Sequence, residues 1–157
     1  MNATRDQAVG VGAVNGSDAT RQGYQILHWA FVIVPVIAGL DKFAHLLTNW
    51  DTYVAPPVAR VLGGYVHPFM LVVGVVEVIA GLIVALKPKI GAYIVAAWLV
   101  AIMINLLLGP KNGDIVLRDF GLCLGALALG RLAATYDVSS RPSKRVPPNV
   151  AFTREIT

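Results

Sequence analysis

The sequence predicts an all-α integral membrane protein: a bundle of four transmembrane helices with polar N- and C-terminal tails. Hydrophobic residues make up 56% of the 157 residues and charged residues only 14%, whereas soluble domains contain about 25% charged residues. Charged residues are sparse between residues 26 and 132 and frequent outside this stretch. The stretch contains four apolar segments, and a helix needs about 20 such residues to cross a bilayer.

The four segments are separated by residues that interrupt helices. The first apolar run, Ile26 to Leu40, has only 15 residues, so its helix is expected to continue to residue 47. A connector over residues 48–65 contains Pro56-Pro57 and Gly63-Gly64 and cannot form one uninterrupted helix. Proline and glycine also separate the later segments. The spans are therefore expected at about 24–47, 66–86, 89–108 and 114–133.

The polar segments 1–23 and 135–157 are expected to be tails outside the membrane domain, which covers residues 24–134. The first lacks the basic patch and apolar run of a signal peptide, so we expect it to be retained. Lys and Arg gather on the cytoplasmic side of membrane proteins. With both termini cytoplasmic, nine of the 13 Lys and Arg residues lie inside and four outside. We expect an inner (cytoplasmic) membrane location with both termini in the cytoplasm.

Motifs for self-contained catalysis or cofactor binding are absent from the sequence. The single cysteine, Cys123, excludes an intramolecular disulfide and is expected to be a small core residue. The three histidines are too scattered for a zinc motif, and no metal site is expected. His45 and His67 form the only candidate pair for haem, but each is better interpreted as an interfacial hydrogen-bonding residue. The basic residues flank apolar segments, which indicates membrane topology and no nucleic-acid partner.

Polar residues inside the expected spans are the candidate functional site, because ionisable groups in a bilayer are costly. Glu77 lies 11 residues after Val66, or roughly 16 Å along a helix, which is near the middle of the bilayer. The others lie toward the outer half. The predicted polar cluster consists of Asp41, Lys42, His45, Glu77, Asn105, Arg118 and Asp119.

The charges in this cluster are complementary. We expect crossed pairing of Asp41 with Arg118 and of Lys42 with Asp119. An unpaired Glu77 would be protonated, whereas a shared partner, Lys42 or Arg118, would keep it ionised. Two interpretations stay open: a network that holds the bundle together, or an outward-facing polar pocket for a ligand or a proton. No catalytic role is assigned to any of these residues.

Three short motifs resemble the DoxX-like family of small four-helix membrane proteins. They are Gly39-Leu-Asp-Lys42-Phe in the first span, Glu77 with Ala80-Gly81-Leu in the second, and Arg118-Asp119 at the start of the fourth. The resemblance covers about residues 25–133 and omits the long tails. It implies a role beside membrane redox enzymes, since the family takes its name from a subunit of a thiosulfate:quinone oxidoreductase. It carries over Lys42, Glu77, Arg118 and Asp119 as polar-site positions only.

Three functions follow as expectations. The first is an accessory or anchoring subunit of a quinone-linked redox complex, whose polar cluster binds a small ligand or a quinone headgroup. Any oxidoreductase activity would then belong to the complex, with other membrane subunits or further copies of this chain as partners. The second is a purely structural membrane subunit without a ligand. The third is a small proton-coupled transporter that uses Glu77 as the exchanging carboxyl.

Overall fold

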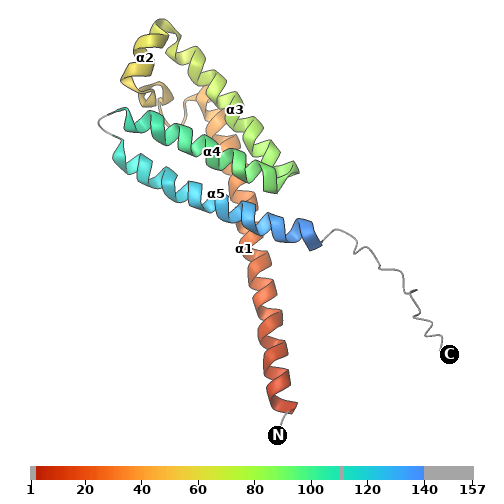
Figure 1. Ribbon diagram of the computed structural model, residues 1–157. Helices are drawn as coiled ribbons and strands as arrows, with labels where there is room; N and C mark the ends of the chain where they lie inside the picture. The colour runs from red at the N-terminus through yellow and green to blue at the C-terminus, as the bar shows by residue number, and fades with distance from the viewer. Residues whose placement is uncertain (1–2, 110–111, 140–157) are drawn as a thin grey trace, which may run out of the picture.

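A computed structural model describes residues 3–109 and 112–139, and over these ranges the chain is helical and contains no strand. The all-α prediction is therefore confirmed. Four long helices form the body of the molecule, and a short α-helix with two 3-10 turns connects the first two of them (Figure 1). The elements are α1 (Ala3–Ala44), η1 (Trp50–Tyr53), α2 (Pro56–Leu62), η2 (Gly63–Tyr65), α3 (Val66–Leu86), α4 (Pro88–Leu107) and α5 (Gly113–Ser139).

Three helical segments of the described chain are long and apolar enough to cross a membrane: Asp18–Ala44, Pro56–Leu86 and Pro88–Leu107. Their outward faces carry large apolar side chains, such as Leu40 on α1 and Ile104 on α4, which are more than half exposed. Soluble proteins rarely expose apolar surface on this scale. The helices therefore indicate a membrane protein.

The fourth long helix, α5, contains the segment expected to be the fourth span. It is less apolar than α3 and α4, because Arg118, Asp119 and Arg131 lie within it. It nevertheless packs along α4 over most of its length (Figure 1). That α5 crosses the bilayer stays a prediction.

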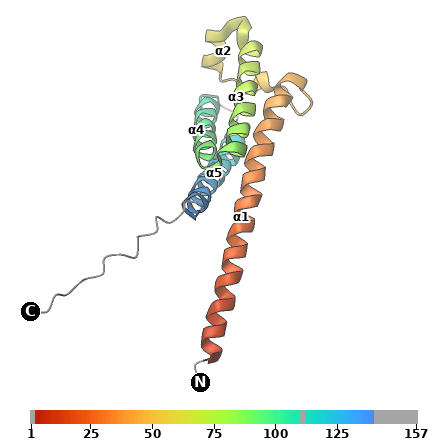
Figure 2. The ribbon, with the colours of Figure 1, turned by 90° about the vertical axis from the view of Figure 1, so that its right-hand side faces the viewer.

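The ends of α1 differ from the sequence expectation. The helix ends at Ala44 rather than at residue 47, and His45 adopts a left-handed conformation with a φ of 51°. At the other end α1 begins at Ala3 and passes through the segment assigned to a polar tail, projecting beyond the bundle (Figures 1 and 2). This segment lacks proline, which would interrupt a helix, and contains equal numbers of alanine and glycine residues. Of the C-terminal tail, residues 140–157 lie outside the described residues.

The four helices pack as two close pairs, α1 with α3 and α4 with α5, joined through the contact of α3 with α4. The backbones of α1 and α3 touch at two glycines: a Cβ on Gly39 would lie 2.5 Å from the Gly74 carbonyl oxygen. Close approach through small residues is the usual way to join helices in lipid. Cys123 is buried as predicted, in a core cluster made by Phe31, Ala80, Val84, Ala92, Val95, Ala96, Cys123, Ala126 and Leu129.

The connector folds over one end of the bundle and is held there by α4. The Asn105 side chain accepts a hydrogen bond from the Ala55 amide at 3.0 Å and donates one to the Tyr53 carbonyl at 2.8 Å. Asn105 thus binds the backbone on both sides of the break between η1 and α2. As predicted, the connector is not one continuous helix: α2 begins at Pro56 and ends at Leu62, and the Gly63 that follows has a φ of 55°.

Candidate functional site

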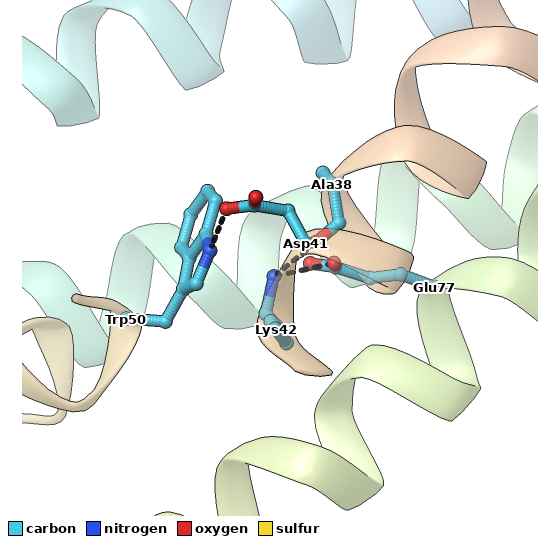
Figure 3. A network of polar contacts seen from close by, with 5 residues as sticks. All are labelled: Ala38, Asp41, Lys42, Trp50 and Glu77. Atoms are coloured by element: carbon cyan, nitrogen blue, oxygen red, sulfur yellow. Dashed lines mark hydrogen bonds and ion pairs between the residues drawn. The ribbon is translucent and has the colours of Figure 1, made fainter. Parts of the chain in front are cut away.

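An ion pair between Lys42 and Glu77 lies at the centre of the predicted polar cluster (Figure 3). Lys42 Nζ is 2.5 Å from Glu77 Oε2, and only 3% and 10% of the two side chains are exposed. Lys42 comes from the last turn of α1, and Glu77 comes from the middle of α3. The contact of Gly39 with Gly74 brings these two helices close enough for the charges to meet.

The Lys42 ammonium has two further contacts. It donates a hydrogen bond to the Ala38 carbonyl at 3.4 Å, and it lies over the indole ring of Trp50, 3.9 Å from the ring centroid. The negative face of an indole attracts a cation, most strongly where water is excluded. Lys42 is therefore enclosed by a carboxylate, a carbonyl and an aromatic ring.

Asp41, the residue before Lys42, terminates α1 rather than joining the ion pair. Its Oδ1 accepts the backbone N–H groups of Leu46 and Leu47 at 2.9 and 3.0 Å, and its Oδ2 accepts the Trp50 indole N–H at 2.7 Å. A carboxylate at a helix C-terminus is disfavoured by the helix dipole. Here three N–H donors from the following segment compensate for it, so Asp41 folds the chain back over the end of α1.

A second buried acid lies near Glu77. Asp119 on α5 is only 3% exposed, and its charge acts on Glu77. Arg118 binds Asp119 with its guanidinium 3.1 Å from Oδ1, while its own side chain is 64% exposed. Trp98 on α4 also lies close to Glu77, with its buried indole N–H near the carboxylate but without a hydrogen bond of standard geometry among the described residues. The cluster thus joins α1, α3, α4 and α5.

The predicted crossed pairing is wrong. Lys42 binds Glu77 and not Asp119, and Arg118 binds its own neighbour Asp119 and not Asp41. The reason is that Asp41 is occupied by backbone and indole donors at the end of α1, while the close packing of α1 on α3 favours Glu77 as the partner of Lys42. Glu77 is consequently paired and buried, and it does not face lipid.

Two members of the predicted cluster lie elsewhere. Asn105 holds the connector, and His45 lies beyond the end of α1. The rings of His45 and His67 have centroids 5.2 Å apart, and His67 Nδ1 is 3.1 Å from Asp51 Oδ2. Sequence reasoning missed Asp51 at this position, since the fold and not a local motif brings these three residues together.

Sequence reasoning also missed the role of Trp50. No sequence pattern links its indole to Asp41 and Lys42. The spacing of eight positions between Lys42 and Trp50 indicates a contact only if the chain is known to turn back between them. Asp41 provides that turn.

Two apolar grooves lie on the surface of the described helices. One lies between α3 and α4, where Trp98 lines it together with Val76 and Ile94. Another lies between α4 and α5 and is lined by Val100, Met103 and Phe120. Comparison with protein families, curated proteins and solved structures finds no match for this chain.

Proposed function

We propose that this protein is an accessory or anchoring subunit of a quinone-linked redox complex in the cytoplasmic membrane. The observation that carries the proposal is the buried Lys42–Glu77 pair, whose charged groups are used to join α1 to α3. A buried ion pair of this kind holds two helices together and thereby stabilises a structural subunit. The redox context rests on the resemblance of the residues around Lys42, Glu77 and Arg118 to the DoxX-like family.

The proposal includes four crossings with both termini in the cytoplasm. Because α5 packs along α4, a membrane that surrounds α4 also surrounds α5. Leu117, Phe120 and Leu124 on α5 are each more than half exposed, as lipid-facing residues are. Arg118 and Arg131 lie toward the two ends of the expected span 114–133, from which long basic side chains reach the headgroups. The excess of Lys and Arg on the inner segments supports the orientation.

Binding of a ligand or quinone headgroup by the cluster has less support than anchoring. Of the three expected hydrogen-bond donors to a quinone carbonyl, Lys42 and Asn105 are already bonded within the protein, and Arg118 is bonded to Asp119. The indole N–H of Trp98 makes no hydrogen bond of standard geometry among the described residues, but it is buried. Proton-coupled transport through Glu77 also has less support, because an exchanging carboxyl needs contact with water and Glu77 is enclosed against Lys42.

Gentle isolation from the native membrane tests the proposed function. The tagged full-length chain is extracted in a mild detergent, and its stoichiometric partners and extractable quinone are identified by mass spectrometry. We expect a subunit of an oxidoreductase in fixed ratio to this chain. An unrelated four-span protein with the same tag is the control for adventitious capture. Isolation of this chain alone, as a monomer or homo-oligomer under the gentlest conditions, would contradict the proposal.

A further inference from the structure

Two histidines and one aspartate from three separate elements meet at the connector end of the bundle. His45 directly follows α1, Asp51 lies in η1, and His67 is the second residue of α3. Each offers one possible ligand atom, and the three atoms lie within 4.8 Å of one another. The cluster is separate from the Lys42–Glu77 pair, with which it shares no residue.

The hydrogen-bonding capacity of the Asp51 carboxylate is only partly used within the described part of the chain. Its Oδ2 is 3.1 Å from His67 Nδ1, but its Oδ1 is buried and finds no hydrogen-bond partner in the described part of the chain. A buried carboxylate oxygen without a partner is destabilising. A bound cation would satisfy it. The observation therefore points to a positively charged ligand at Asp51, independently of the nearby imidazole rings.

The surrounding chain holds the donors in place. Asp41 fixes the amides of Leu46 and Leu47, which directly follow His45. The Asn49 side chain accepts the Asp51 amide at 3.2 Å and starts the 3-10 turn that carries Asp51. His67 is fixed by its place in the first turn of α3. The backbone is thus held, while the exposed imidazole rings are free to adjust.

The donor types select the cation. Two imidazole nitrogens and one carboxylate oxygen suit Zn²⁺ and related transition-metal dications, whereas Mg²⁺ and Ca²⁺ prefer oxygen ligands alone. Tetrahedral Zn²⁺ places its donors about 3.3 Å apart, given metal–nitrogen bonds of 2.0–2.1 Å. The present spread of up to 4.8 Å needs an inward movement of roughly 1 Å, which rotation of the exposed histidines supplies.

We infer that His45, Asp51 and His67 form a binding site for one transition-metal dication of the zinc class, with the remaining coordination position open to water. The metal would bridge the end of α1, the connector and the start of α3. Binding replaces any proton on the donor atoms and releases it to solvent. The inference does not depend on the proposed redox function.

Metal titration of the purified full-length protein tests this site. The chain is stripped with a chelator in detergent and titrated with Zn²⁺ against a chromophoric competitor, and metal content is measured by elemental mass spectrometry. We expect one Zn²⁺ per chain, with binding weakened at least tenfold in His67→Gln and in Asp51→Asn. His28→Gln is the matched control, since residue 28 lies about 24 Å along α1 from Ala44 and should leave the affinity unchanged.

Co²⁺ provides a second readout that does not depend on affinity. The wild-type protein should give visible d–d absorption, and His45→Gln, a change at an exposed residue, should remove it while helix content and elution volume stay the same. A stoichiometry well below one, unchanged Zn²⁺ affinity in Asp51→Asn, or equal loss in His28→Gln would each overturn the inference.

Discussion

At the scale of single residues, the molecule uses its buried charges in two different ways. Lys42 and Glu77 neutralise each other across two helices, whereas Asp41 binds the chain that follows its own helix. In an environment without water, each charge needs such a partner, because the desolvation of an isolated charge is not otherwise compensated. Neighbouring positions on α1 therefore have distinct tasks: Lys42 joins helices, and Asp41 ends one.

The Lys42–Glu77 pair should behave as a coupled unit. Lys42→Met leaves Glu77 buried without its cation and should lower the free energy of unfolding by about 3 kcal/mol. Adding Glu77→Gln should recover part of that loss, so the double variant is more stable than the sum of the single losses. Unfolding of the detergent-solubilised protein by a denaturing surfactant measures the coupling through a double-mutant cycle.

Arg60→Met is the control for this cycle. Arg60 is an exposed cation whose guanidinium donates to the Pro56 carbonyl of its own helix, and removal of such a surface charge changes stability by less than about 1 kcal/mol. Strictly additive effects at Lys42 and Glu77, or an equal loss in Arg60→Met, would refute the assignment of Lys42–Glu77 as the joining pair.

The individual polar residues were predictable as a group, but their partners were not. The cost of charge in a bilayer identifies Lys42 and Glu77 from the sequence alone. Which acid meets Lys42 depends on the relative placement of α1 and α3, and this is set by Gly39 and Gly74. His45 and His67 could be named as a pair from the sequence, but Asp51 could not be added to them, because the three residues meet only where α1 and α3 lie together.

At the scale of the elements, helix contacts rather than helix composition determine the arrangement. The second and third apolar segments correspond closely to α3 and α4, because proline and glycine mark their ends. The end of α1 was placed too late because length alone was considered, whereas the Asp41 carboxylate stops the helix at Ala44. Hydrogen bonds between a side chain and the backbone thus determine where α1 ends, which the apolar content of the sequence does not.

The contact of α1 with α3 should tolerate no added atom at residue 74. A Cβ there would lie 2.7 Å from the Gly39 carbonyl oxygen and 3.1 Å from Lys42 Cβ, so Gly74→Ala must separate the helices. We expect a loss of about 1–3 kcal/mol, as for other overpacked sites. Gly121→Ala on α5 is the control, because nothing lies within 4 Å of its Cβ. A loss for Gly74→Ala no larger than that for Gly121→Ala, measured by thermal unfolding in detergent, would count against close α1–α3 packing.

At the scale of the whole molecule, the two helix pairs make different contributions to the polar cluster. The α1–α3 pair contains the ion pair, and α5 adds Asp119 to the cluster while packing on α4. Composition and segment lengths were enough to predict an all-helical membrane protein. They were not enough to classify α5, whose Arg118, Asp119 and Arg131 make it less apolar than α3 and α4. Whether α5 crosses the bilayer therefore decides whether the two termini lie on the same side of the membrane.

Labelling of single cysteines from either side of the membrane determines the number of crossings. In a Cys123→Ser background, Asn15→Cys and Arg145→Cys should react only with reagents that enter the cytoplasm, because an even number of spans returns the chain to its starting side. Val61→Cys on α2, whose native side chain is 88% exposed, should react from the opposite side and serves as the control. If α5 lay on the surface instead of crossing, three spans would place residues 15 and 145 on opposite sides, and exactly one of the two would react from outside.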